Sequence, residues 1–145
     1  MRWAAALVAL AACDPRAHVG SCADDLDGAW RDGAGRRWAI LDHRGSARAL
    51  ELFPMFDDSA AAPGGVTAAP RRIDARPSDG GLAGQVGRRF MLRAAVCEGR
   101  APFQIAACHD DALDVVTSDP AAPTGFAPCA WPRAATVRAE RWHRD

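Results

Sequence analysis

Apolar and polar residues alternate along short segments of this chain. No extended segment places its apolar residues at the spacing of an amphipathic helix. The clearest alternation runs from Leu82 to Arg93. A period of two places successive side chains on opposite faces of a strand, so this segment predicts a strand with one buried face. The residues expected on that face are Leu82, Gly84, Val86, Arg88, Phe90 and Leu92.

Seven other segments have strand character, and Gly and Pro recur too often for long helices. The eight predicted strands are Leu26–Arg31, Arg37–His43, Ala47–Phe53, Arg71–Arg76, Leu82–Arg93, Phe103–Cys108, Ala112–Thr117 and Ala134–His143. Consecutive antiparallel strands favour a small up-and-down barrel, because closure removes the exposed edges of an open sheet. A two-sheet β-sandwich is the alternative.

Strands that alternate in direction divide the loops between two ends. The tight polar turns expected where the chain enters are Arg44-Gly45, Pro77–Gly81 and His109–Asp111. The loops expected at the opposite end are Asp32–Arg36, Pro54–Pro70, Glu98–Pro102 and Ser118–Arg133. Long loops in compact domains are commonly functional or flexible. We expect Pro54–Pro70 to be flexible and Ser118–Arg133 to be packed, and a binding mouth would lie at their end.

The N-terminus has a different pattern, in which Arg2 precedes an apolar run over residues 3–12 that is too short to span a bilayer. Leu10-Ala11-Ala12-Cys13 resembles the lipobox of bacterial lipoproteins. That resemblance implies a cleaved signal peptide over residues 1–12 and a lipidated Cys13 as the mature N-terminus. Residues 13–21 then form a tether, and residues 22–145 form a single domain.

The same resemblance implies a location and a partner. Several acyl chains on Cys13 would anchor the protein firmly in a membrane. We therefore expect a lipid-anchored, periplasm-facing protein of the cell envelope. Asp14 follows the lipidated cysteine, as in lipoproteins retained at the inner membrane, and favours that membrane.

The composition predicts a thin core, since 33 of the 145 residues are alanine. Four cysteines remain after Cys13 to supplement it, and an oxidising compartment favours two disulfides. Strand alternation places Cys22 and Cys108 at the tether end, and Cys97 and Cys129 at the far end. We therefore predict the bridges Cys22–Cys108 and Cys97–Cys129.

The basic residues are 18 arginines with no lysine, balanced by 18 acidic residues. Because Asn and Tyr are also absent, a GC-rich genome explains this bias. No basic run is present, so we expect no nucleic-acid partner.

Gly28-Ala29-Trp30 in the first predicted strand is similar to the Gly-x-Trp of lipocalin first strands. This short motif implies a lipocalin-like barrel.

Three clusters contain residue types that are common in catalytic or metal sites. Asp24-Asp25-Leu26-Asp27-Gly28 lacks the first and last ligands of a calcium loop, and Cys108-His109-Asp110-Asp111 favours a solvated turn. Asp42-His43-Arg44-Gly45-Ser46 holds the residue types of a triad within one turn, where a hairpin would spread them apart. We therefore expect no metal, no cofactor and no enzymatic activity.

Arg88 is predicted on a buried face, where a guanidinium needs a carboxylate partner or an anionic ligand, unless a bulge at Gly84 or Gly87 returns it to solvent. The candidate ligand pocket consists of Trp38, Phe53, Phe56, Arg88, Phe90, Phe126 and Trp131. The aromatic residues of this set would equally serve as the barrel core.

Two functions follow from these expectations. The first is a non-catalytic barrel that binds a small apolar or amphipathic ligand, and a cavity lined by Trp38 and Phe90 would favour it. The alternative is a protein-interaction or inhibitor module of the envelope, which a filled barrel with an exposed Phe126–Trp131 patch would favour.

Overall fold

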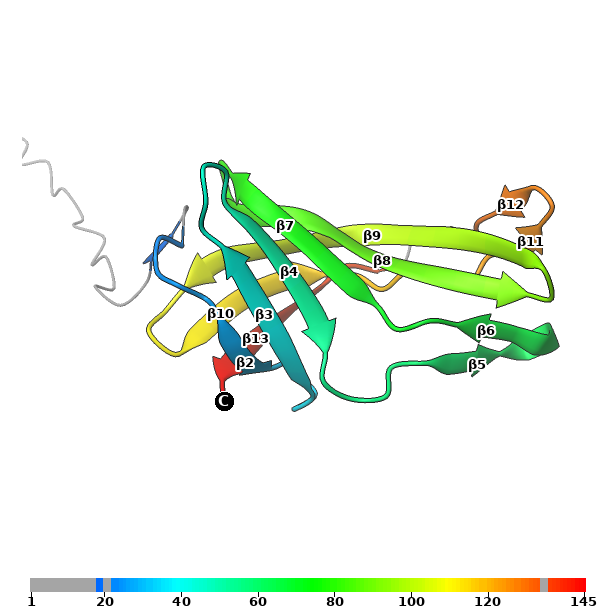
Figure 1. Ribbon diagram of the computed structural model, residues 1–145, viewed down its shortest axis with the longest axis horizontal. Helices are drawn as coiled ribbons and strands as arrows, with labels where there is room; N and C mark the ends of the chain where they lie inside the picture. Colours follow the sequence, from blue (N-terminus) through cyan, green and yellow to red (C-terminus); the bar gives the residue numbers. More distant parts are fainter. Residues whose placement is uncertain (1–17, 20–21, 134–135) are drawn as a thin grey trace, which may run out of the picture.

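A computed structural model describes residues 18–19, 22–133 and 136–145, and it is an antiparallel β structure with one short 3-10 turn, η1 (Pro63–Gly65) (Figure 1). The lipobox, Cys13, Asp14 and residues 1–12 lie outside the described residues. No helix in the described part of the chain has the length and apolar character required to cross a membrane.

Eight strands form a closed barrel in meander order, so the predicted up-and-down barrel is confirmed. They are β2 (Gly28–Arg31), β3 (Arg37–His43), β4 (Ala49–Pro54), β7 (Arg72–Ser78), β8 (Gly81–Leu92), β9 (Ala95–Cys108), β10 (Ala112–Thr117) and β13 (Arg138–Arg144). Each strand pairs with the next, and β13 closes on β2 through Arg144 and Trp30. The eight predicted segments correspond to these strands in order, with ends that differ by a few residues.

The largest difference in strand length concerns β9. The loop predicted over Glu98–Pro102 lies inside this strand, and the chain turns at Arg93 and Ala94 instead. Pro102 is tolerated because its main chain faces the edge where β10 ends, and its carbonyl accepts a hydrogen bond from Ser118 N. Packing favours glycine at position 99, since an added Cβ would lie 3.0 Å from Pro120 and 3.1 Å from Phe90 and Trp131. Gly99 and Pro102 indicate a turn in the sequence, but in the structure both lie within β9.

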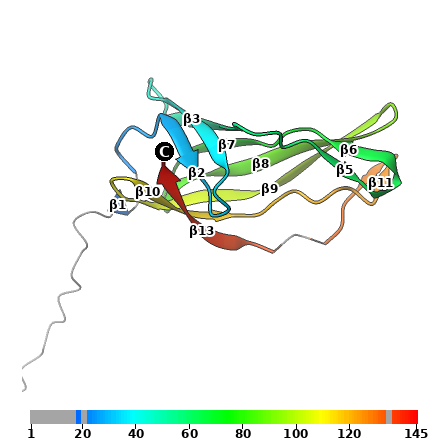
Figure 2. The ribbon, with the colours of Figure 1, turned by 90° about the horizontal axis from the view of Figure 1, so that it is seen from below.

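The β8–β9 hairpin extends well past the barrel, and the long loops fold beside it (Figures 1 and 2). The segment predicted as a flexible loop contains β5 (Ala60–Ala62) and β6 (Val66–Ala68), and Thr67 and Ala68 of β6 pair with β8. The later loop contains β11 (Gly125–Phe126) and β12 (Cys129–Ala130), in agreement with a packed segment. We call this projection the arm: residues 59–69, 88–99 and 120–131.

The opposite end of the barrel is the tether end. There the short turns β3–β4, β7–β8 and β9–β10 gather, as predicted. β1 (His18–Val19) pairs with Ala107 and Cys108 of β9. His18 and Val19 of the predicted tether therefore add a short strand beside β9, past the start of β8.

Both predicted disulfides are present. Cys22 is bonded to Cys108 at the tether end, with 5.3 Å between their Cα atoms. Cys97 is bonded to Cys129 in the arm, with 5.8 Å between their Cα atoms. One bridge therefore holds the chain entry to β9, and the other holds the later loop to the arm.

Candidate functional site: the barrel mouth and the distal arm

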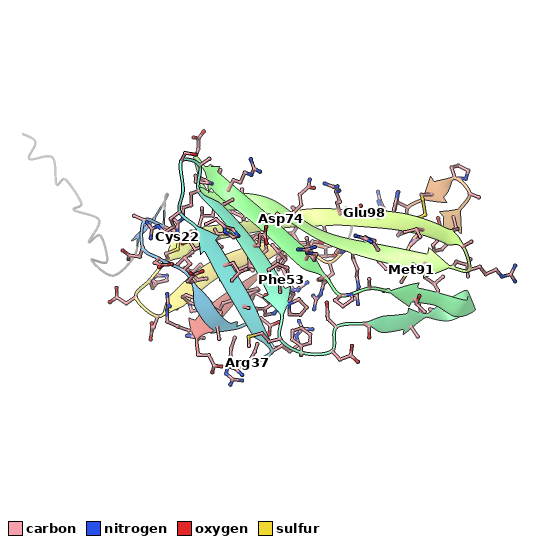
Figure 3. All side chains as sticks on the ribbon, in the orientation of Figure 1. Cys22, Arg37, Phe53, Asp74, Met91 and Glu98 are labelled. Atoms are coloured by element: carbon pink, nitrogen blue, oxygen red, sulfur yellow. A yellow bond between two sulfur atoms is a disulfide. The ribbon has the colours of Figure 1, made fainter. Side chains whose placement is uncertain are left out.

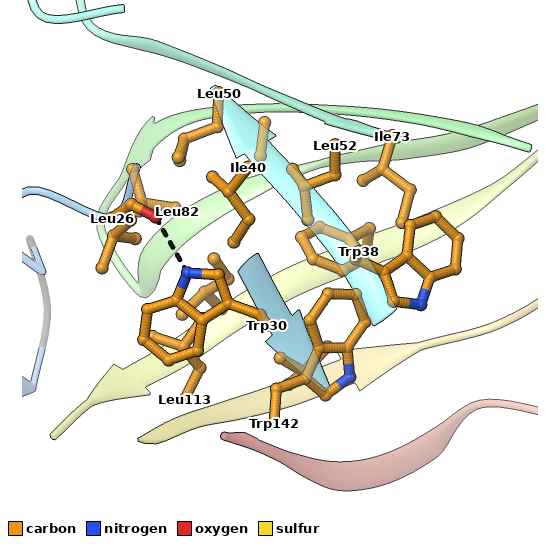
Figure 4. Close-up of a cluster of buried hydrophobic side chains, with 14 of the residues drawn as sticks. Leu26, Trp30, Trp38, Ile40, Leu50, Leu52, Ile73, Leu82, Leu113 and Trp142 are labelled. Atoms are coloured by element: carbon orange, nitrogen blue, oxygen red, sulfur yellow. Dashed lines mark hydrogen bonds between the residues drawn. The ribbon is translucent and has the colours of Figure 1, made fainter. Parts of the chain in front are cut away.

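The barrel interior is filled by side chains. Trp30, Trp38 and Trp142 are at most 2% exposed, and Trp38 stacks on Trp142 with 5.5 Å between ring centroids (Figure 4). Trp30 Nε1 donates to Leu26 O at 2.9 Å, which satisfies its buried polar atom. The guanidinium of Arg144 lies 4.6 Å from the centroid of the Trp30 ring. The Gly-x-Trp tryptophan thus belongs to the core.

An ionic cluster covers the far mouth of the barrel. Arg71 is 4% exposed and donates from Nε and Nη2 to the two carboxylate oxygens of Asp58, at 2.8 and 2.7 Å. Its Nη1 donates to Asp119 at 2.7 Å, and Arg138 donates to the second oxygen of Asp119 at 3.0 Å. The Arg71 guanidinium also lies 5.0 Å from the Trp38 ring centroid. The network therefore closes the barrel directly over its aromatic core.

The carboxylates of this cluster have lowered pKa values. Burial by itself raises the pKa of Asp58, but the hydrogen bonds and charge of Arg71 outweigh it, and the net shift is downward. For Asp119 burial likewise raises the pKa, and Arg71 and Arg138 together bring it below its ordinary value. The hollow bordered by Trp38, Arg71, Asp119 and Trp142 measures about 10 Å³. A single water needs about that much room, so the mouth holds no space for an organic ligand.

The predicted pocket residues do not line one cavity. Trp38 belongs to the barrel core, and Phe56 packs edge-on against it at 5.6 Å between centroids. Phe53 lies on the outer wall, with the Arg72 guanidinium 4.9 Å from its ring centroid. The remaining members, Arg88, Phe90, Phe126 and Trp131, lie in the arm. The alternation of apolar and polar residues predicts which face of a strand each side chain occupies. It does not show how far β8 extends past the barrel, so it could not separate residues of the barrel from residues of the arm.

Arg88 lies on the inward face and is half-buried, so no bulge returns it to solvent. Its hydrogen bonds go to main-chain carbonyls and not to a carboxylate. Its Nε donates to Ala69 O at 2.9 Å, and its Nη2 donates to Asp58 O. The arginine that is buried against carboxylates is Arg71, which the sequence did not single out. Its partners lie 13 and 48 residues away in irregular segments, beyond the reach of any local pattern.

The arm has a small core of its own, formed by Val66, Ala68 and Phe90, with Leu92 and Phe126 packed against it. Trp131 contacts Phe90 edge-on at 6.2 Å between ring centroids and remains 42% exposed. The arm is thus packed and disulfide-bonded, yet it leaves a large aromatic side chain at the surface.

Two grooves border the β9 strand where it leaves the barrel. The Trp131 groove, of about 410 Å³, lies between residues 98–102 of β9, residues 118–121, and residues 131–133 with Val137. The arginine groove, of about 860 Å³, lies on the outer face of β7, β8 and β9. It is lined by Phe53, Arg72, Gly87, Arg89 and Met91, among others. Glu98 borders both grooves, so the two surfaces adjoin.

The clusters with catalytic residue types are arranged for structure. Asp42 is buried and bound by Arg48, whereas the neighbouring His43 points to solvent, 3.9 Å from Glu51. His109 contacts Asp114 at 2.9 Å, and Arg141 also binds Asp114. None of these residues borders either groove. Among the residues that the structure describes, no three His, Cys, Asp or Glu side chains gather as metal ligands.

Comparisons with protein-family models, with curated proteins and with solved structures gave no match.

Proposed function

We propose that this chain is a lipid-anchored protein-interaction module of the bacterial cell envelope, and that the arm carries its binding surface. The observation that supports this function over small-ligand transport is the filled barrel. Three tryptophans occupy the interior, and an ionic cluster covers the far mouth, where a ligand would have to enter.

The position of the arm supports the same proposal. The arm projects from the end of the barrel opposite β1, so a chain anchored at Cys13 would direct it away from the membrane (Figures 1 and 2). A second small core and a disulfide maintain its shape. Rigid projections with an exposed aromatic residue are suited to protein partners, because a preordered surface loses little entropy on binding.

The Trp131 groove is the surface that we assign to the partner. Trp131 and Val137 are exposed apolar side chains beside three prolines, and Arg133 supplies a polar rim. A partner that inserts an apolar side chain beside Trp131 would bury this surface. We expect Trp131 to account for a large share of the binding energy, as buried tryptophans do in protein interfaces.

Site-specific photocrosslinking in the producing cells tests this function. A photoreactive aromatic residue at position 131 should yield a discrete protein adduct. The matched control is position 41, because Leu41 on the barrel wall is 43% exposed, against 42% for Trp131. Adducts of equal yield at both positions would contradict an interface on the arm.

The small-ligand function is tested in parallel. Native mass spectrometry of the membrane-extracted protein should show the lipidated chain without a stoichiometric small molecule. A bound small molecule, together with no adduct at position 131, would favour the ligand-binding barrel instead.

A further inference from the structure

The arginine groove has features that the Trp131 groove does not share. Strand register places Arg72, Gly87 and Arg100 in one row across β7, β8 and β9. Neighbouring strands lie about 4.8 Å apart, so the two arginines begin about 10 Å from each other with a bare glycine between them. Arg72 borders the arginine groove, whereas Arg100 borders the Trp131 groove and donates to Gln85 and Glu98. The row therefore places a position without a side chain next to Arg72, on the outer face of the sheet.

The floor of the arginine groove is open at Gly87. A Cβ added at Gly87 would find its nearest neighbour, the carbonyl oxygen of Arg72, at 3.7 Å. In Figure 3, Phe53, Asp74, Met91 and Glu98 lie around the outer face of these strands. Apolar side chains and arginine stems thus surround a space in which a main chain could approach the sheet.

The charges around the groove are not balanced. Within the described part of the chain, Arg72 and Arg89 have no carboxylate within ion-pair distance. By contrast, Arg100 contacts Glu98 at 3.1 Å and Arg71 is held by Asp58. Asp74 is the other acidic residue of the lining. In a chain with no net charge overall, this face has an excess of cations.

We infer that the arginine groove binds an acidic, extended segment of a partner protein, with carboxylates beside Arg72 and Arg89 and an apolar side chain against Met91. Charge complementarity favours an acidic occupant. The volume, about 860 Å³, is far larger than a free phosphate requires. The distance of the groove from the tether end disfavours a lipid headgroup.

The aromatic surface disfavours a polysaccharide. Sugar rings bind to sheets by stacking on open aromatic faces, but the guanidinium of Arg72 already lies over the Phe53 ring. An acidic peptide needs no such stacking surface. This site shares only Glu98 with the lining of the Trp131 groove, and its test is independent of the function proposed for that surface.

Binding of a fluorescent peptide of alternating Glu and Leu to the full mature chain in detergent tests the inference. We expect saturable, salt-sensitive binding to the wild-type protein. Arg72→Gln with Arg89→Gln should weaken it at least about tenfold, because two charge contacts are lost. Gly87→Leu should weaken it by a similar factor without any change in charge, because it fills the floor.

Arg93→Gln is the matched control, since Arg93 is exposed at the β8–β9 turn and does not line the groove. It should change the affinity less than about twofold. Thermal unfolding verifies that each variant is folded.

Any of these results would overturn the inference: no binding at millimolar peptide, an equal loss with Arg93→Gln, equally tight binding of the Gln–Leu analogue, or displacement of the peptide by millimolar inorganic phosphate at constant ionic strength. Binding to anionic lipid vesicles that Gly87→Leu weakens as strongly would overturn it in favour of a headgroup site.

Discussion

The guanidinium of Arg71 and the carboxylate of Asp58 form a two-point ion pair, with contacts of 2.7 and 2.8 Å, on top of the tryptophan core. Both residues are buried, and Asp58 also accepts a hydrogen bond from the main-chain nitrogen of Arg71 at 2.9 Å. The pair holds the segment after β4 against the start of β7. It therefore determines how the arm joins the barrel.

Arg71→Met should destabilise the protein by about 3–5 kcal/mol, because it leaves the Asp58 carboxylate buried without a partner. Arg138→Met removes a more exposed cation from the same cluster and should cost about 1 kcal/mol or less. The free energy of unfolding in urea measures both variants. Equal losses would show that Arg71 contributes no more than a surface ion pair.

Acid should weaken the barrel mouth. The folded pKa values of Asp58 and Asp119 lie below their unfolded values, so their stabilising contribution is present above about pH 4 and is lost as the pH falls through the folded values. We expect unfolding midpoints in urea to be nearly constant from about pH 7 to 5 and to decrease below about pH 4. A decrease that begins near pH 6.5 would instead indicate histidine titration.

Two glycines of β8 should respond differently to alanine. A Cβ at Gly84 would lie 1.7 Å from the carbonyl oxygen of Asp74, so Gly84→Ala must displace β7. We expect a loss of about 2–3 kcal/mol, or failure to fold. Gly87→Ala meets nothing closer than 3.7 Å and should be neutral or slightly stabilising. Thermal unfolding of the two variants tests this difference, and an equal loss would contradict it.

The two disulfides should have separable effects. Replacing Cys22 and Cys108 with alanine opens a loop with a sequence separation of 86 and should cost about 4–5 kcal/mol of global stability. Replacing Cys97 and Cys129 should chiefly loosen the arm. Limited proteolysis should then cleave near residues 120–130 while the barrel remains intact. Loss of the whole fold in that second variant would show that the barrel depends on the arm.

Cys13→Ala should release the protein from membranes, because the proposed anchor is the lipid on that residue. Fractionation of cells that produce the full chain measures this, and intact mass should show the acyl chains on the wild type only. A Cys13→Ala protein that still sediments with membranes would contradict the anchor.

Local pattern was sufficient to predict the barrel, because its strands are sequential and each buries alternate residues. The same alternation also placed the cysteines at the correct ends. It failed for β9 because Gly99 and Pro102 resemble a turn. In the structure, the close packing of Trp131 favours glycine at position 99, and Pro102 faces the edge where β10 ends. Arg71 binds carboxylates far away in the sequence, and Gly87 lies beside residues of neighbouring strands. The residues next to them in the sequence give no indication of either arrangement.

The two disulfides also define a mechanical path. Cys108 and Cys97 both lie in β9, and Cys108 is joined to Cys22 beside the proposed tether. Tension between a partner on the arm and the lipid anchor would pass from Cys22 through one bridge into β9, and through the other bridge into the arm. The other barrel strands lie outside this covalent route. Pulling on the complex would therefore load β9 along its length and shear its hydrogen bonds to β8 and β10.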